Sequence, residues 1–317
     1  MPIVSGADDV IRIERNKAEV GMKRMNVLGL AVAALMTMVP IAAVAAPKPI
    51  APAATPFRIG ALRAFALRDM VNVVPNDNKV FGIGETPQAV AKVLAAAGAP
   101  TDAITLGVDA LLVEEPGHIV LIDTGLGPKI GGVLMQSLAK AGVAPDAVTD
   151  VLITHSHGDH VGGLVTADGR PAFPKATIRL SETEWAWMRR NPGQAAIVAA
   201  ISPRVKPFVP GGAVLPGITA VALPGHTPGH VGYEIVSKGA RLLDIGDSAH
   251  SSIVSLARPD WPIGYDHDQT AGIATRKRLL GELARSHERL FAPHFPYPGV
   301  GTVVVSGKGY AFRPGLE

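Results

Sequence analysis

The stretch that decides the fold is Thr154-His155-Ser156-His157-Gly158-Asp159-His160, which follows the apolar run Val151-Leu152-Ile153. A short run rich in β-branched residues predicts a strand, here over 148–153, that delivers the histidines into the turn after it. On such a strand His155 and His157 project to one face, and the turn carries Asp159 and His160 to a second point nearby. Imidazoles and a carboxylate at this spacing are typical of metal ligands. The loop is therefore predicted to serve two metal ions.

Ligand-type residues also follow other apolar runs of the chain. These are Asp123 after 118–122, His226 after 218–223, Asp247 after 241–245 and His294 after 290–292. Residues that follow the strands of an α/β protein meet at one end of its sheets. A carboxylate buried at such a position needs a partner for its charge, so we expect Asp123 to support a ligand imidazole. Capping of its own turn is the alternative.

The N-terminal part of the chain has the pattern of a secretory leader. Lys23 and Arg24 precede the apolar run 27–45, which ends in small residues. Residues 1–46 are therefore predicted to be an N-terminal extension and a signal peptide, the peptide itself at about 22–46. Because Pro40 interrupts the run, cleavage is favoured over a retained membrane anchor. We expect a periplasmic or secreted protein with no stable membrane anchor.

Residues 47–56 are rich in proline and alanine and predict an extended linker. The remaining residues, 57–317, are long enough for one domain with a sizeable core. The chain has 30 basic and 27 acidic residues, and no run of Lys or Arg indicates a nucleic-acid partner. No cysteine is present, so any metal ligands must offer nitrogen or oxygen.

Three further patterns have mainly structural interpretations. Ser181-Glu182-Thr183-Glu184 predicts a capping box at the start of a helix that carries Trp185 and Trp187. His118 is interpreted as a surface residue beside a turn, and His230 as a residue that stabilises its own Pro/Gly turn. An apolar pocket is expected from the loop near Phe81, the tryptophan helix and the segment 195–212.

With these motifs the chain resembles the metallo-β-lactamase-fold hydrolases, from about residue 57 to residue 314. The resemblance rests on Asp123-Thr-Gly, the 155–160 motif, His226, Gly246-Asp247 and His294, in this order. Within the superfamily the chain is most similar to the exported methyl parathion hydrolase-like and lactonase group. The resemblance implies an α/β (α+β) fold, a four-layer αβ/βα sandwich with a dinuclear site at the edges of its sheets.

The resemblance also implies a ligand set of two divalent metal ions, for which Zn²⁺ suits the nitrogen and oxygen donors. The first ion is assigned His155, His157 and His226, the second Asp159, His160 and His294, and Asp247 is expected to bridge them. Such a pair supplies a hydroxide nucleophile at neutral pH. The expected reaction is hydrolysis of a small-molecule lactone, ester or phosphotriester.

Two residues are expected to act on the reacting groups. Asp159 is predicted to steer the nucleophile and relay its proton. His250, three residues after Asp247, is predicted to donate to the developing oxyanion or to the leaving group. The alternative is a histidine at the surface or one that supports the metal ligands from behind. Two rival functions stay open at this point, a β-lactam hydrolase and a non-catalytic metal-binding protein of the same fold. An Asp247 outside the metal ligands would favour the first rival. The oligomeric state is also open, a homodimer included.

Overall fold

The computed structural model describes residues 50–317, so the predicted leader lies outside the described residues. The strands in this part are β1 (Ala54–Ile59), β2 (Leu62–Pro75), β3 (Ala103–Glu115), β4 (His118–Ile122), β5 (Asp150–Leu152), β6 (Thr177–Arg179), β7 (Ala213–Leu215), β8 (Ile218–Ala222), β9 (Val231–Ser237), β10 (Ala240–Asp244), β11 (Arg289–Phe291), β12 (Val300–Ser306) and β13 (Gly309–Pro314). The α-helices are α1 (Pro87–Ala96), α2 (Leu134–Lys140), α3 (Gly158–Val161), α4 (Glu182–Met188), α5 (Ala195–Ile201), α6 (Val254–Ala257) and α7 (Gln269–Ser286).

The strands form two mixed sheets. The first has the order β1-β2-β3-β4-β5-β6, and its parallel pairs are β4 with β5 and β5 with β6. The second has the order β13-β12-β11-β10-β9-β8-β7, with β10 and β11 parallel. β1 already pairs with β2 at Ala54, so the last three residues of the segment predicted as a linker belong to the sheet.

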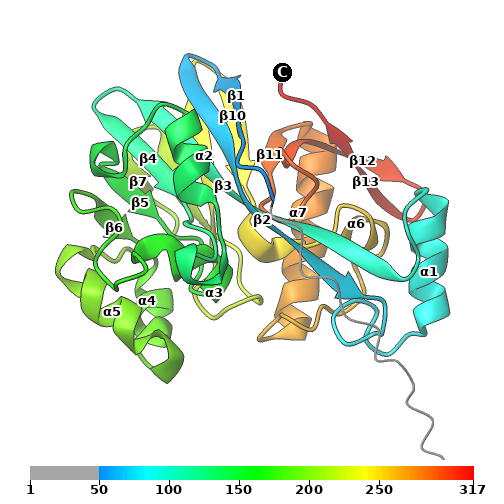
Figure 1. Ribbon diagram of the computed structural model, residues 1–317. Helices are drawn as coiled ribbons and strands as arrows, with labels where there is room; N and C mark the ends of the chain where they lie inside the picture. The colour runs from blue at the N-terminus through cyan, green and yellow to red at the C-terminus, as the bar shows by residue number, and fades with distance from the viewer. Residues whose placement is uncertain (1–49) are drawn as a thin grey trace, which may run out of the picture. The chain divides into compact units, whose positions relative to one another are not determined.

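The sheets and helices stack in four layers (Figure 1). Apolar side chains of both sheets, such as Leu111 and Tyr233, meet in a core between the sheets. The outer face of the first sheet packs against α2, α3, α4 and α5, and the outer face of the second packs against α7. This is the predicted αβ/βα sandwich, and the prediction of the fold is confirmed.

β2 and β3 extend beyond the rest of their sheet as a paired arm. The arm packs against α1 through apolar residues that include Val74, Leu94 and Leu106. Phe81 lies in the same cluster, where it is buried. In residues 50–317 no helix is long and apolar enough to cross a membrane.

Candidate metal centre

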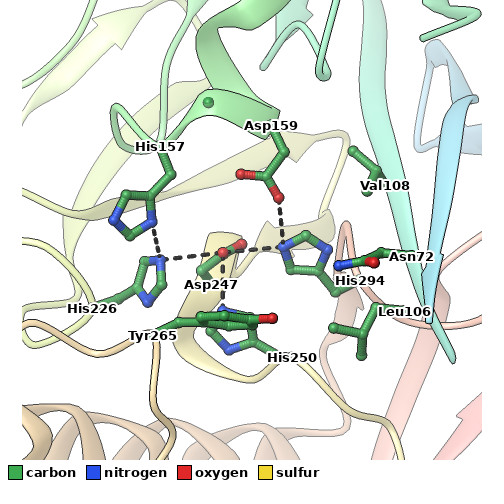
Figure 2. Close-up of a pocket in the computed structure, with 11 residues that line it drawn as sticks. Asn72, Leu106, Val108, His157, Asp159, His226, Asp247, His250, Tyr265 and His294 are labelled. Atoms are coloured by element: carbon green, nitrogen blue, oxygen red, sulfur yellow. Dashed lines mark hydrogen bonds and ion pairs between the residues drawn. The ribbon is translucent and has the colours of Figure 1, made fainter. Parts of the chain in front are cut away.

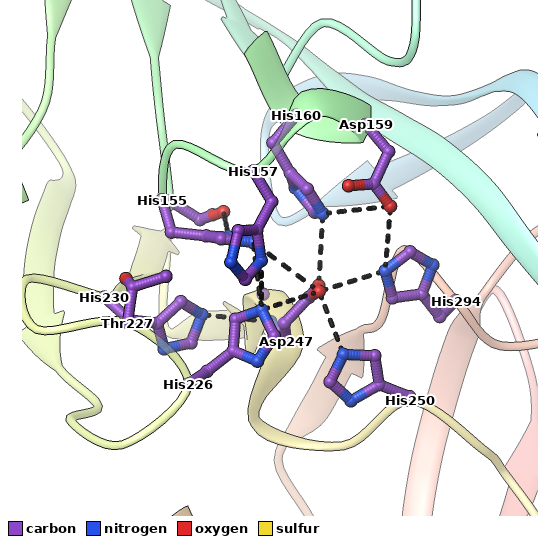
Figure 3. Close-up of polar contacts among 12 residues, drawn as sticks. His155, His157, Asp159, His160, His226, Thr227, His230, Asp247, His250 and His294 are labelled. Carbon is purple, nitrogen blue, oxygen red and sulfur yellow. Dashed lines mark hydrogen bonds and ion pairs between the residues drawn. The ribbon is translucent and has the colours of Figure 1, made fainter. Parts of the chain in front are cut away.

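The predicted ligands meet at one end of the two sheets, in loops that follow strands (Figure 3). The strand before the central motif is shorter than predicted: β5 ends at Leu152, so His155 and His157 lie on the loop and not on a strand. From the first sheet come His155 and His157 after β5 and Asp159 and His160 in α3; from the second come His226 between β8 and β9, Asp247 after β10 and His294 after β11.

Three imidazoles form the first cluster. His155 Nε2 lies 3.1 Å from His157 Nδ1 and 3.1 Å from His226 Nε2, and the latter two atoms are 2.8 Å apart. These three ring nitrogens cannot all hydrogen-bond to one another, because a neutral imidazole has one proton and a nitrogen without it can only accept. A cation that accepts their lone pairs fits this arrangement.

The second cluster joins the loop of the first sheet to β11. Asp159 Oδ2 lies 3.6 Å from His294 Nε2 and 3.8 Å from His160 Nε2. The ligand atoms of these three residues lie within 4.8 Å of one another. His160 Nε2 is buried and has no hydrogen-bond partner among the described residues.

Asp247 lies between the two clusters (Figure 3). Its Oδ2 is 3.2 Å from His226 Nε2 and 3.1 Å from His294 Nε2, and its Oδ1 is 3.3 Å from His160 Nε2. One carboxylate therefore reaches both groups of imidazoles. This position agrees with the bridging role that the resemblance implied.

The second ring nitrogen of most ligand histidines is fixed by an oxygen. His294 Nδ1 donates to Gly107 O at 2.7 Å, and His160 Nδ1 donates to Asp123 Oδ2 at 2.7 Å. His226 Nδ1 is 3.1 Å from Asp266 Oδ1. Because a carbonyl or carboxylate only accepts, each ring carries its proton on Nδ1 and presents the lone pair of Nε2 to the cluster. Preset tautomers of this kind are typical of metal-binding histidines.

Asp123 has the environment that the sequence predicted. In addition to the hydrogen bond from His160, its carboxylate accepts hydrogen bonds from Thr154 N at 2.9 Å and from Thr154 Oγ1 at 2.7 Å. Its φ of 61° lies in the left-handed region, which a residue other than glycine rarely adopts and which is often found at functional sites. The carboxylate thus orients a ligand imidazole and joins β4 to the loop after β5.

Burial and neighbouring charges shift the pKa values of the ligand residues, some downward and one upward. Burial lowers the pKa of His155 well below its ordinary range and that of His157 to about 4. Burial has the same tendency at His294, but the carboxylates of Asp247 and Asp159 overcome it and raise the pKa to about 9. Burial disfavours the charged form of Asp247, yet the surrounding imidazoles hold its pKa well below the usual value. A bound cation would take the place of the protons on these rings.

The two further histidines near the site differ in their contacts. His250 is buried, its Nε2 lies 3.1 Å from Asp247 Oδ2, and neither ring nitrogen has hydrogen-bond geometry with a described partner. His230 does more than stabilise its own turn: Nδ1 donates to Leu223 O at 2.8 Å, and Nε2 accepts from the backbone N–H of Asp247 at 3.0 Å. Gly246 is required beside it, because a Cβ there would lie 2.5 Å from His230 Nε2.

Sequence reasoning missed two carboxylates that support the first cluster. Asp266 contacts His226, and no local motif indicates this contact because the two residues are far apart in the sequence. Glu184 was assigned to a capping box, and only half of that box exists: Ser181 Oγ accepts from the backbone of Glu184, but the carboxylate turns inward to Ser156 and Thr227. His118 is partly exposed beside its turn, as expected, and its Nδ1 also lies 2.8 Å from the buried Asp150, a contact that the sequence did not indicate.

A cavity of about 310 Å³ opens directly onto the centre (Figure 2). His157, Asp159 and His250 line it on the metal side, and Leu106 and Val108 of β3 form an apolar wall. This differs from the expected walls: Phe81 and Trp185 are core residues, and the segment 195–212 does not line the cavity. Trp187 lies outside the lining set but packs edge-on to His157, at 5.9 Å between ring centroids.

The family model of the metallo-beta-lactamase superfamily matches residues 103–304. The chain belongs to this superfamily. Among curated proteins the chain is similar to the uncharacterized protein YobT of Bacillus subtilis (strain 168), 32% identical over 168 residues that cover 50% of this chain and 70% of YobT. Hydroxyacylglutathione hydrolase of Yersinia pestis (strain Pestoides F) is 29% identical over 39% of this chain and 41% of its own length.

Two solved structures of the superfamily match nearly over their whole length. AidC, a dizinc quorum-quenching lactonase in complex with the product N-hexnoyl-L-homoserine, has a TM-score of 0.79 and 27% identity, covering 83% of this chain and 98% of AidC. The hydrolase AbOPH has a TM-score of 0.76 and 29% identity, covering 84% of this chain and 98% of AbOPH. The chain is therefore a metallo-hydrolase of the metallo-β-lactamase superfamily, and enzymes of this fold that act on small molecules include the lactonase AidC.

Proposed function

We propose that this metallo-β-lactamase-fold protein is a dinuclear, zinc-dependent hydrolase of ester-type bonds, with a lactone as its leading substrate class. One observation carries the proposal: five imidazoles, three of them with preset Nδ1 protons, form two clusters that share the carboxylate of Asp247. A structural zinc site needs only four ligands around one ion. A second cluster that opens onto a cavity fits catalysis better than stability.

The residues present fit two divalent ions. His155, His157 and His226 would hold one, Asp159, His160 and His294 the other, and Asp247 both. When bound, such a pair supplies an activated water and polarises the carbonyl or phosphoryl bond of the substrate. Imidazole and carboxylate donors without thiolates suit zinc, and they also suit Mn²⁺ or Co²⁺.

Protein groups around the cavity would handle the protons. In lactone hydrolysis water adds to the carbonyl carbon, the ring C–O bond breaks, and the proton lost by the water ends on the leaving alkoxide. Asp159 lines the cavity, and although burial disfavours its charged form, His160 and His294 lower its pKa, so it is ionised and can accept and pass on that proton.

His250 faces the same cavity (Figure 2). Burial lowers the pKa of this imidazole, so the ring is neutral at pH 7 and offers one N–H and one lone pair. We assign it the donation of a hydrogen bond to the oxyanion that develops on the substrate. The apolar wall of Leu106 and Val108 beside it suits the acyl part of an apolar lactone.

The rival functions fare differently. Asp247 lies at the meeting point of both clusters, which is the opposite of the arrangement that would have favoured a β-lactam hydrolase. The likeness to a dizinc lactonase over nearly its whole length supports lactones ahead of phosphotriesters.

Export to the periplasm or beyond remains part of the proposal, since residues 1–49 lie outside the described structure. Cell fractionation, together with the intact mass and N-terminal sequence of the mature protein, tests the export.

The decisive experiment is hydrolysis of long-chain acyl lactones by the zinc-loaded protein, with a chelator-treated sample as control. Fast ring opening that disappears with the metal and returns when zinc is restored is the expected result. If two metals bind but no lactone opens, the lactonase assignment is wrong, and phosphotriesters and β-lactams become the substrates to test.

A further inference from the structure

The carboxylate of Glu184 is a buried junction behind the first cluster. Its side chain is fully buried at the start of α4, and no basic side chain pairs with it among the described residues. Instead it accepts four hydrogen bonds: Oε1 from Ser156 N at 2.8 Å and Ser156 Oγ at 2.6 Å, and Oε2 from Thr227 Oγ1 at 2.7 Å and Gly229 N at 3.0 Å. Hydrogen bonds to a charged acceptor are among the strongest in proteins.

The donors of Glu184 belong to the two loops that supply the first cluster. Ser156 stands between His155 and His157, and Thr227 directly follows His226. The first loop comes from the first sheet and the second from the opposite sheet. One side chain thus spans the junction between the sheets and fixes how far apart these three imidazoles lie.

Neighbouring contacts make this arrangement rigid. Gly229 packs so closely on α4 that a Cβ would lie 2.2 Å from the backbone nitrogen of Glu184. Ser181 Oγ donates to Gly229 O at 2.7 Å, and the side chain of Gln194 donates to Ser156 O. The loop of His226 therefore rests directly on the helix that carries Glu184.

The second cluster has separate supports. His160 is held by Asp123, and His294 by the carbonyl oxygen of Gly107. Neither contact involves α4 or the loop 226–230. A change at Glu184 therefore acts directly on the first cluster and reaches the second only through Asp247, which His230 contacts and both clusters share.

We propose that Glu184 is a positioning residue that sets the geometry of the first metal position and acts selectively on it. The inference rests on the proposed function in one respect, that the first cluster binds a metal. In Glu184→Gln the shape of the side chain is kept, but its NH₂ group meets N–H and O–H donors and cannot accept their hydrogen bonds. Loss of such outer supports weakens metal binding by about 10- to 100-fold.

The test is metal binding by the purified full chain, followed by zinc competition with a chromophoric chelator and by Co²⁺ absorption. We expect E184Q to bind one of two ions about 10- to 100-fold more weakly and to keep the affinity of the other. Glu182→Gln is the matched control, because it removes an exposed carboxylate from the same helical turn. It should bind both ions as the unaltered chain does.

Equal affinities in E184Q and the unaltered chain, or equal weakening of both ions, would overturn the inference. An unaltered chain that does not bind two ions would instead overturn the proposed function. Thr227→Val keeps the size of a buried side chain and removes one donor, so it serves if E184Q does not fold. It should weaken the same ion by a smaller factor, and an unchanged affinity there also counts against the inference.

Discussion

The two clusters of the metal centre draw ligands from both sheets, but different groups hold them in place. The first cluster depends on side-chain carboxylates, Glu184 behind the loops and Asp266 behind His226. The second depends on Asp123 in a strained backbone conformation and on a main-chain carbonyl of β3. Asp247 is the one side chain that both share. The comparison suggests that each metal position can be weakened separately.

Replacement of the shared carboxylate should have the largest effect. Asp247→Asn removes a negative charge that imidazoles of both clusters face. Because the loss of an outer support already costs about 10- to 100-fold in metal affinity, the loss of this ligand should exceed about 100-fold for at least one ion and abolish hydrolysis. Metal analysis after dialysis, with lactone hydrolysis in parallel, checks this. Retention of both ions would show that Asp247 is not shared.

Asp123→Asn should weaken the second position most, by about 10- to 100-fold, because Asp123 contacts His160 directly and the first cluster only through Thr154. Asparagine tolerates the left-handed backbone conformation at this site, so the substitution tests the carboxylate rather than the turn. Its amide can accept only part of the hydrogen bonds from Thr154 and His160. Zinc competition compares it with Glu184→Gln. If both variants lose the same ion, the two clusters are not supported separately.

A smaller effect is expected for Asp266→Asn. The amide oxygen can still accept the proton of His226 Nδ1, so the first position should weaken by only about 10-fold. The amide NH₂ would face the buried Arg276, whose Nη1 lies 3.5 Å from Asp266 Oδ2, so the free energy of unfolding is measured beside the zinc affinity. Asp268→Asn is the control, because it alters an exposed carboxylate nearby that caps α7 and that asparagine replaces well. An effect of Asp268→Asn as large as that of Asp266→Asn would argue against a specific role for Asp266.

The smallest effect on metal binding is expected for a buried cluster outside the metal centre. Asp150 accepts from Arg179 Nε at 2.9 Å and contacts His118 Nδ1 at 2.8 Å. Burial disfavours its charge, but the hydrogen bonds from His118 and Arg179 prevail and lower its pKa. Its ionised form therefore stabilises the fold above the ordinary pKa of an aspartate, and this contribution fades as the pH falls through the lowered value.

Asp150→Asn should accordingly reduce the free energy of unfolding by about 1–3 kcal/mol at pH 7. The difference should begin to shrink below the ordinary pKa of an aspartate, about 4, and should vanish as the pH falls through the lowered pKa of Asp150 in the folded chain. Urea denaturation of the metal-free protein at both pH values measures it. Asp146→Asn, at an exposed ion pair with Lys175, should change stability by well under about 1 kcal/mol. Zinc affinity should be the same in both variants.

The ligands could be predicted from the sequence because their signal is local. Each of them follows an apolar run, and the 155–160 motif places several ligands within one turn. Asp123 carried the same signal, and the structure places it against His160 as expected. The layers of the fold followed from the resemblance that these motifs carry.

The supports and the pocket were less predictable for physical reasons. The Ser-x-x-Glu pattern at Glu184 is as typical of a helix start as of a buried junction, and only the packing of α4 on the loop 226–230 decides between them. Asp266 meets His226 only through the tertiary fold. The wall of the cavity comes from the extended β2–β3 arm, and a strand pattern does not say which face lines a site.

The arm has a consequence for how the specificity of this enzyme can change. On one strand, β3, the main chain supports a predicted metal ligand and the side chains line the cavity: the carbonyl of Gly107 fixes His294, while Leu106 and Val108 on either side face the cavity. A point mutation replaces a side chain and leaves the carbonyl where it is. New substrates are therefore accessible by substitutions at positions 106 and 108 that leave the catalytic apparatus intact, so selection can act on preference and on chemistry independently.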